Sequence, residues 1–212
     1  MEVKICGIRK QAEITYLNEY KPEYAGFVIW EKSKRYVSVE DADKLMKLLD
    51  NDIKRVAVTV APTLELIEQI NETEFDIIQI HKNLSEDMIE KSQKPIWYAI
   101  NISEVEEIKS NLQFIKNLPC ELYTKIRAIV VDGAKYGSGQ TFKWDDYSFD
   151  ELKEMLTDKK IILAGGLNCD NVKNGINKFK PDVVDVSSGV EGTNGKDREL
   201  IKLFIERAKE NE

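Results

Sequence analysis

The amino-acid sequence predicts an α/β fold, a single-domain (β/α)8 TIM barrel in which strands and helices alternate. Eight short runs rich in β-branched residues recur along the 212 residues, and segments with helical periodicity lie between them. Most of these runs are continuously apolar rather than alternating, as expected for parallel strands that are covered on both faces. Eight such units in a chain of this length favour closure into a barrel over an open, doubly wound sheet.

The predicted strands follow one another at intervals that suit one strand and one helix each. They are, in order, VKIC (3–6), YAGFVI (24–29), RVAVTV (55–60), DIIQI (76–80), IWYAI (96–100), AIVV (128–131), IIL (161–163) and DVVDV (182–186). Among the predicted helices, residues 39–49 and 200–208 show a clear amphipathic spacing of apolar side chains. No Pro- or Ser-rich linker or internal repeat interrupts the pattern, so one domain is predicted over residues 1–212.

Composition argues against several classes of function. The net charge of −7 disfavours wholesale nucleic-acid binding, although local backbone N–H groups can still hold an anionic substrate. The sequence does not start like a signal peptide, and it has no apolar run of the about 20 residues that span a bilayer. Cys6, Cys120 and Cys169 show no CxxC spacing, which disfavours a disulfide framework or a structural zinc site. A cytoplasmic protein without membrane contact, monomeric or homodimeric, is expected.

The loops after the seventh and eighth strands have the features of a phosphate site. A Gly-Gly pair follows the strand at 161–163 directly, with Asn168 as the expected N-cap of the next helix. A Ser-Ser-Gly sequence ends the strand at 182–186. Glycine lets a ligand approach the backbone closely, successive N–H groups bind anions, and this end of a barrel frequently binds phosphate. The candidate binding residues are Gly165, Gly166, Ser187, Ser188 and Gly189.

A thiol and a carboxyl group stand at the ends of the first and sixth strands. Cys6 alone would be interpreted as a small core residue and Asp132 alone as a turn carboxylate. At the carboxyl ends of barrel strands, however, the two can face each other across the barrel mouth as a proton-transfer pair. His81, the only histidine, ends the fourth strand and is expected to serve hydrogen bonding rather than catalysis. A single histidine excludes a multi-histidine metal site, and no metal is expected.

Two other kinds of enzyme lack their sequence motifs here. No GxSxG nucleophile elbow is present, which disfavours a Ser-His-Asp triad. The GSG sequence at 137–139 follows the sixth strand but lacks the GxGxxG spacing, so a dinucleotide site is unsupported. Proton transfer on a phosphorylated small molecule remains the better supported chemistry.

Six segments of the sequence occur together in one known family. They are KICGI (4–8), GFVIWEKSKRYVS (26–38), QIHKN (79–83), VVDGAKYGSGQTFKW (130–144), LAGGLNCDNV (163–172) and VDVSSGVEGTNGKD (184–197). In this order and combination they resemble phosphoribosylanthranilate isomerase. The resemblance implies a barrel that performs, without a cofactor, the Amadori rearrangement of N-(5′-phosphoribosyl)anthranilate to its 1-deoxyribulose phosphate isomer in tryptophan biosynthesis.

The resemblance also implies roles for individual residues. Asp132, as general acid, would donate a proton to the furanose ring oxygen, and Cys6, as general base, would then remove the proton on C2′. This chemistry needs a raised pKa for the acid and a lowered pKa for the thiol. Arg35, which the KSKR run alone would mark as an exposed charge, would bind the anthranilate carboxylate through its planar guanidinium.

The sequence departs from the family pattern at three positions. Lys34 stands where proline is usual, Lys82 where glycine is common, and Tyr136 replaces the first glycine of a Gly-rich segment. None of the three is one of the two residues expected to transfer protons, so these departures bear on substrate affinity more than on reaction type.

Three other functions fit part of the sequence. ProFAR isomerase of histidine synthesis performs the same rearrangement on a larger substrate, but it has a carboxylate where this chain has Cys6. Indoleglycerol phosphate synthase would need a catalytic lysine and glutamate set that is not found here. A phosphosugar-binding barrel that has lost turnover is disfavoured by the presence of both Cys6 and Asp132.

Overall fold

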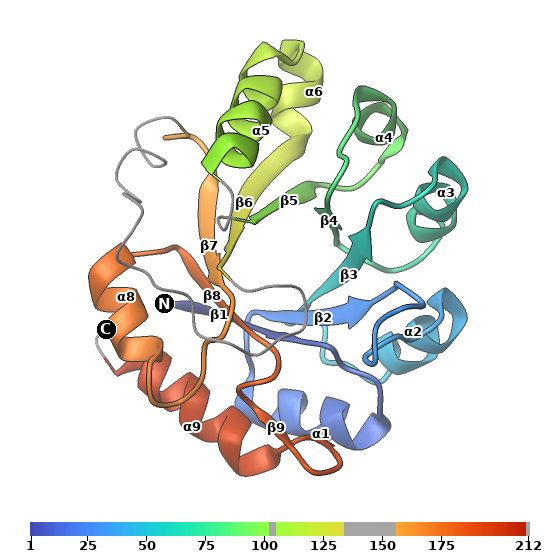
Figure 1. The fold of residues 1–212 in the computed structure, drawn as a ribbon. Helices are drawn as coiled ribbons and strands as arrows, with labels where there is room; N and C mark the ends of the chain where they lie inside the picture. The colour runs from blue at the N-terminus through green and yellow to red at the C-terminus, as the bar shows by residue number, and fades with distance from the viewer. Residues whose placement is uncertain (102–104, 134–155, 211–212) are drawn as a thin grey trace.

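Eight parallel strands close into a barrel in their sequence order, from β1 next to β2 around to β8 next to β1 (Figure 1). The computed structural model describes residues 1–101, 105–133 and 156–210. The strands are β1 (Glu2–Cys6), β2 (Tyr24–Val28), β3 (Lys54–Val60), β4 (Ile77–His81), β5 (Ile96–Asn101), β6 (Ile126–Asp132), β7 (Lys160–Ala164) and β8 (Val183–Val186). All eight predicted strands are therefore confirmed, with ends that differ from the prediction by one or two residues.

Helices surround the barrel as an outer ring (Figure 1). They are α1 (Gln11–Tyr20), α2 (Val39–Met46), α3 (Leu64–Asn71), α4 (Glu86–Lys91), α5 (Val105–Asn117), α6 (Cys120–Lys125), α8 (Val172–Phe179) and α9 (Arg198–Lys209). Helix starts follow ordinary capping chemistry, since Ser38, Thr63 and Asp197 each accept a hydrogen bond from the N–H group three residues ahead. The short helix α6 was not expected. None of the described helices is long and apolar enough to cross a membrane.

The core has two layers, which explains why the strands are apolar on both faces. One layer lies between the strands and the helices and contains side chains such as Ile5 and Val131. The other fills the barrel interior, where Cys6 and Val130 belong. Because successive side chains of a strand point to opposite faces, Asp132 follows Val130 into the interior. Strand periodicity thus directs the last side chains of β1 and β6 into the barrel.

The loop between β7 and α8 differs from the prediction that Asn168 caps the helix. The helix begins at Val172, and Asn171 is its N-cap residue. The Oδ1 atom of Asn168 instead accepts hydrogen bonds from the backbone N–H groups of Asp170 (2.8 Å) and Asn171 (3.1 Å). This is an Asx turn that leads into the helix, a conformation that short Asn side chains favour. The N-cap prediction was wrong by three residues.

A two-stranded antiparallel hairpin, β9 (Glu191–Gly192) and β10 (Gly195–Lys196), follows β8 and precedes α9. The side chains of Glu191 and Lys196 lie on the inner side of this hairpin, and Lys196 is buried. Its ammonium group donates to the backbone carbonyl of Ser187 at 2.9 Å. The hairpin therefore fixes the segment that directly follows β8, on the side of the barrel where the strands end.

Candidate active site

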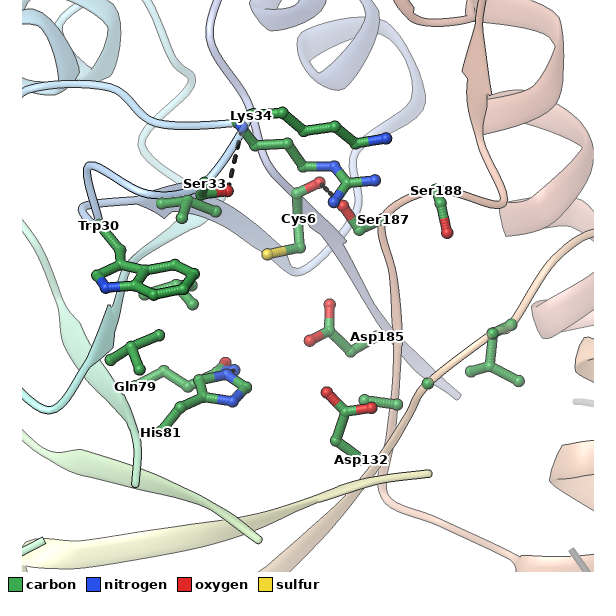
Figure 2. Close-up of a pocket in the computed structure, with 18 of the residues that line it drawn as sticks. Cys6, Trp30, Ser33, Lys34, Gln79, His81, Asp132, Asp185, Ser187 and Ser188 are labelled. Carbon is green, nitrogen blue, oxygen red and sulfur yellow. Dashed lines mark hydrogen bonds between the residues drawn. The ribbon is translucent and has the colours of Figure 1, made fainter. Parts of the chain in front are cut away.

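A cavity of about 490 Å³ opens at the carboxyl ends of the strands. Every residue that the sequence singles out as a site candidate lines it, except Gly189. Figure 2 shows Cys6, His81, Asp132, Ser187 and Ser188 around this space. The lining candidates are Cys6, Arg35, His81, Asp132, Gly165, Gly166, Ser187 and Ser188. Residues up to 182 positions apart thus meet in one cavity, because the barrel brings all strand ends to one edge.

The thiol of Cys6 and the carboxyl group of Asp132 both face this cavity (Figure 2). Cys6 is 8% exposed, and Asp132 is half-buried. Burial raises the pKa of the Cys6 thiol, while the positive charges of Lys4 and Lys196 act in the opposite direction. The chemistry implied by the sequence resemblance asks for a lowered pKa of this thiol, so the protein departs from that expectation. The physical reason is that desolvation outweighs the neighbouring cations.

Beneath the cavity lies an ion pair that the sequence reasoning missed. Lys4 is completely buried, and its Nζ atom donates to Oδ2 of Asp185 at 2.8 Å. Asp185 reaches the cavity wall, and its Oδ1 atom is buried without a hydrogen-bond partner among the described residues. Burying a charge is costly unless it is paired. A signal was present in the sequence, because a lysine and an aspartate interrupt two otherwise apolar strands.

Arg35 is buried rather than exposed, so interpreting the KSKR run as solvated charge is wrong at this position. Its Nε and Nη2 atoms donate to the two carboxylate oxygens of Glu191 at 2.6 and 2.8 Å. Burial alone would raise the pKa of Glu191, but hydrogen bonds and charges from Arg35 and Lys196 lower it to about 2. Glu191 therefore stays ionised and holds the guanidinium in place. Nη1 of Arg35 donates no hydrogen bond within the described part of the chain, so it is available to a ligand.

The backbone around Arg35 is adapted to its side chain. A Cβ atom on Gly7 would lie 2.6 Å from Cδ of Arg35, and Gly7 has a positive φ of 86°. Glycine at this position therefore makes room for the arginine. The carbonyl of Lys34, which replaces the usual proline, accepts a hydrogen bond from Nη1 of Arg9 at 2.8 Å. Ser33 Oγ accepts from the Arg35 N–H group at 3.1 Å (Figure 2). These contacts hold the loop without the proline.

His81 is buried in the cavity wall beside Gln79. Nε2 of Gln79 lies 2.8 Å from Nε2 of His81, which fits an amide N–H donating to a neutral imidazole. Burial, followed by the positive charges of Lys4 and Lys82, lowers the pKa of His81 to about 3. The imidazole therefore stays uncharged at any pH where the protein would work. This supports a hydrogen-bonding rather than an acid–base use of the only histidine.

We expect His81→Gln to flatten the dependence of folding stability on pH. The unfolded chain binds a proton on His81 below its ordinary pKa of 6.5, whereas the folded chain does not until about pH 3. The contribution of His81 to the free energy of unfolding is thus complete above pH 6.5. Below that pH it decreases by about 1.4 kcal/mol for each unit by which the pH is lowered. Urea unfolding at a series of pH values from about 6 to 4 measures the slope. If the unfolding free energy changed equally with pH in the parent protein and in His81→Gln, the folded state would protonate His81 at its ordinary pKa.

The residue after His81 adopts a backbone conformation that favours glycine. Lys82 has φ of 62° and Asn83 φ of 51°, both in the left-handed region. A non-glycine residue in this region costs about 1 kcal/mol, with asparagine tolerated better than most. Lys82 in place of the family's common glycine therefore costs stability.

The two predicted phosphate loops lie next to each other. Gly165 and Gly166 have positive φ values of 90° and 69°, as their place after β7 requires. A Cβ atom on Gly189 would lie 2.0 Å from the carbonyl oxygen of Leu167, so this glycine is needed for the close passage of the two loops. Among the described residues, the backbone N–H groups of Gly166 and Ser188 donate no hydrogen bond. Both groups are thus available to an anion.

Ser187 has a different role in the loop from that of Ser188. Its hydroxyl donates to the carbonyl oxygen of Cys6 at 2.9 Å (Figure 2), and it accepts from Lys196 at 3.2 Å. These contacts tie the ends of β1 and β8 together. The Ser188 side chain takes part in no such network within the described residues, and in Figure 2 it lies on the side of the cavity opposite the ring of Trp30.

The remaining sequence observations concern other parts of the chain. Cys120 is exposed at the start of α6, while Cys169 is buried and contacts the carbonyl of Leu200. Tyr136 and the GSG sequence at 137–139 lie outside the described residues. Within residues 1–101, 105–133 and 156–210, no three His, Cys, Asp or Glu side chains gather in a group that could hold a metal ion.

Comparison with known proteins gives one consistent result. The family model for N-(5′-phosphoribosyl)anthranilate isomerase matches residues 3–207. The chain is 38% identical to the N-(5′-phosphoribosyl)anthranilate isomerase of Clostridium acetobutylicum and 40% identical to that of Thermoanaerobacter pseudethanolicus, covering 99% of this chain and 98% of each relative. These matches extend over almost the whole chain.

Solved structures agree with the sequence comparison. The isomerase of Thermotoga maritima is 29% identical, superposes with a TM-score of 0.83, and is covered over 99% of both chains. A phosphoribosylanthranilate isomerase solved in complex with reduced 1-(o-carboxyphenylamino)-1-deoxyribulose 5-phosphate superposes with a TM-score of 0.81 at 29% identity, again over 99% of both chains. By its fold and by the extent of these matches, the chain belongs to the N-(5′-phosphoribosyl)anthranilate isomerase family.

Proposed function

We propose that this protein isomerises N-(5′-phosphoribosyl)anthranilate to 1-(2-carboxyphenylamino)-1-deoxyribulose 5-phosphate in tryptophan biosynthesis, without a cofactor, as one domain over residues 1–212. The observation that carries the proposal is one cavity into which the Cys6 thiol and the Asp132 carboxyl group both face, with an arginine and the loops after β7 and β8 in its wall. An isomerisation of this kind needs one acid and one base around an anchored sugar.

The reaction divides between the two side chains. Asp132, protonated, donates to the furanose ring oxygen, the bond between that oxygen and C1′ breaks, and a protonated Schiff base forms. The Cys6 thiolate then removes the proton on C2′, and the electron pair moves to give the enolamine. Ketonisation of the enolamine yields the ketose product, so the isomer has the same atoms as the substrate. A thiolate is the reactive form of Cys6, which makes the charges around it decisive.

The two ends of the substrate fit different parts of the cavity. The phosphate suits the loops after β7 and β8, where free N–H groups and glycine backbone meet. The anthranilate carboxylate suits Arg35, which Glu191 already holds and which keeps Nη1 for a ligand. The indole of Trp30 also lines the cavity and offers a flat apolar face to the anthranilate ring. Trp30 was not singled out in the sequence, where it appears as one apolar residue after β2.

Turnover of freshly generated phosphoribosylanthranilate tests the proposal directly. The expected result is loss of the substrate's fluorescence at a rate that follows enzyme concentration, with no turnover of ProFAR. A folded protein that binds the reduced product analogue but leaves the substrate unchanged would identify a non-catalytic phosphosugar-binding barrel instead.

We expect Gly166→Ala to weaken binding of the reduced product analogue by about 10-fold. A side chain at φ of 69° is strained by about 1–2 kcal/mol, and relief of the strain moves the N–H group away from the phosphate. Ser188→Ala is the matched control, because only the backbone N–H group of Ser188 is expected to bind the phosphate. The affinity of this variant for the analogue should change by less than about 3-fold. Calorimetric titration gives both constants. A larger loss for Ser188→Ala than for Gly166→Ala would assign phosphate binding to the hydroxyl.

The relatives of this chain bear on its assembly state and on its place in the cell. A Thermotoga maritima relative is described as dimeric, and this chain is 29% identical to it. We infer a monomer or homodimer that meets its small phosphorylated substrate in the cytoplasm. Analytical ultracentrifugation of the full chain distinguishes the two assembly states.

A further inference from the structure

Lys4 is a fully buried charged side chain for which the proposed reaction has no role. It lies one residue before Ile5 and two before Cys6, so strand periodicity directs both Lys4 and Cys6 into the barrel interior. On the neighbouring strand, Asp185 is in register with Lys4, and the amine donates to its Oδ2 atom at 2.8 Å. The lysine is thus fixed directly beneath the expected general base.

The positive charge of Lys4 also acts on the thiol of Cys6, which lies on the same face of β1, and it lowers the pKa of that thiol against the effect of burial. The space for the two side chains comes from Gly26 of β2, which is in register with Cys6. A Cβ atom on Gly26 would lie 2.9 Å from Sγ of Cys6 and 3.2 Å from Cε of Lys4. Any larger residue would therefore push against the thiol and the lysine together. Three strands cooperate to place one cation on a carboxylate and near a thiol.

We propose that Lys4 is a positioning residue that stabilises the thiolate form of Cys6, with Asp185 holding the lysine in place. The inference rests on the proposed function, because it assigns Lys4 to the general base of that reaction. Because Asp185 pairs with Lys4, the cation remains paired whether or not the thiol carries a proton. When Cys6 takes the C2′ proton, Lys4 keeps its ion pair with Asp185, so no buried charge is left alone.

Several charged groups act on Cys6, and Lys4 is the cation that lowers the pKa of its thiol most. Burial would lower the pKa of Lys4, but Asp185 and Cys6 raise it above its ordinary value, so the amine stays protonated and does not itself act as a base. The other titratable groups around the thiol are Asp185 from β8, Lys196 from β10, Arg35 from the loop after β2, and Asp132 and His81 in the cavity wall. A variant must therefore change Lys4 alone to isolate its effect.

Alkylation of Cys6 by iodoacetamide, followed by peptide mass spectrometry across a pH series, measures the thiolate without reference to turnover. In Lys4→Met the midpoint for Cys6 should rise by about one to two pH units, the scale of a lost opposite charge close to the group. Cys120 is exposed and is read from the same digest, so its profile should be identical in both proteins. Lys160→Met is the matched control, because it removes an exposed lysine that pairs with Glu2 at the amino end of β7.

The pH dependence of isomerase turnover should change in the same direction as the alkylation profile of Cys6. The rising limb of kcat/KM against pH should shift upward by the same amount in Lys4→Met, and kcat at pH 7 should fall by about 10-fold or more while KM changes by less than about 3-fold. If Lys4 had only a structural role, its loss would lower both kcat and kcat/KM without moving the rising limb of the pH profile. An unchanged limb together with an unchanged Cys6 alkylation midpoint overturns the inference and leaves the proposed function standing.

A second variant keeps the test valid if Lys4→Met fails to fold because Asp185 is left unpaired. Lys4→Met combined with Asp185→Asn removes both charges, and its Cys6 midpoint should lie above that of the parent protein. A midpoint at or below the parent value overturns the inference. If the parent protein does not turn over phosphoribosylanthranilate, the proposed function fails, while the alkylation series still decides whether Lys4 stabilises the thiolate.

Discussion

Replacing Cys6 by serine or Asp132 by asparagine should each lower turnover of phosphoribosylanthranilate by at least about 100-fold, the usual scale for a lost general base or acid. Serine keeps the size of cysteine but holds its proton far more tightly, so it cannot remove the C2′ proton. Asparagine keeps the shape of the carboxyl group but has no acidic proton for the ring oxygen. Steady-state kinetics with fluorescence detection measure both losses.

Folding should be almost unaffected by either substitution, because both side chains face the cavity rather than the packed layer beneath the helices. Cys169→Ser is the matched cysteine control, since Cys169 is buried, contacts the Leu200 carbonyl and lies outside the cavity lining. That variant should keep native turnover. Near-native activity of Cys6→Ser or Asp132→Asn, with native thermal unfolding, would remove the residue concerned from the proton-transfer pair.

Most of the barrel could be predicted from the sequence because its strands are buried on both faces. A run such as the one at 128–131 is apolar throughout, and the sum of eight such runs points to one closed sheet. Helix ends were harder to place. α2 ends at Met46 although apolar spacing continues to residue 49, and α6 is a short helix with little periodicity of its own. Local turns that end helices depend on contacts that periodicity does not describe.

The site was predictable only where it coincides with strand ends. Cys6, Asp132 and the glycines after β7 lie there, and knowledge of barrel folds directs attention to them. Lys4 and Asp185 were missed because they lie inside strands, 181 residues apart, and become partners only through the register of β1 and β8. Each is a charge in an apolar run, and together they form the kind of pair that burial requires.

The arginine site adds a second group of partners that spacing could not predict. Glu191 lies 156 residues from Arg35, and Lys196 comes from the second strand of a two-stranded hairpin. The sequence shows both within VEGTNGKD, a segment that looks like an exposed turn. Only the fold shows that this turn folds back onto the barrel mouth, where its carboxylate holds the guanidinium and its lysine holds the carboxylate.

Arg35→Ala should weaken binding of the reduced product analogue by about 10- to 150-fold. A charge-assisted hydrogen bond to the anthranilate carboxylate contributes roughly 1.5–3 kcal/mol, which corresponds to that range. Because Glu191 occupies Nε and Nη2, the carboxylate is expected on Nη1, the donor that the described residues leave unused. Calorimetric titration with the analogue gives the loss directly. A bare pentose phosphate lacks the carboxylate, so its affinity should hardly change.

Lys34→Ala separates recognition of the carboxylate from diffuse electrostatic attraction. Lys34 also lines the cavity and carries the same charge, but it is adjacent to Arg35 rather than held by Glu191. A screened, long-range effect would make both substitutions similar and would vanish as ionic strength rises. Recognition by a fixed guanidinium predicts a large, salt-resistant loss for Arg35→Ala and a small, salt-sensitive one for Lys34→Ala. If the two variants lose equally, or if Arg35→Ala weakens the pentose phosphate as much as the analogue, Arg35 does not bind the anthranilate carboxylate. Selection of the aromatic half of the substrate would then have to come from the apolar wall around Trp30.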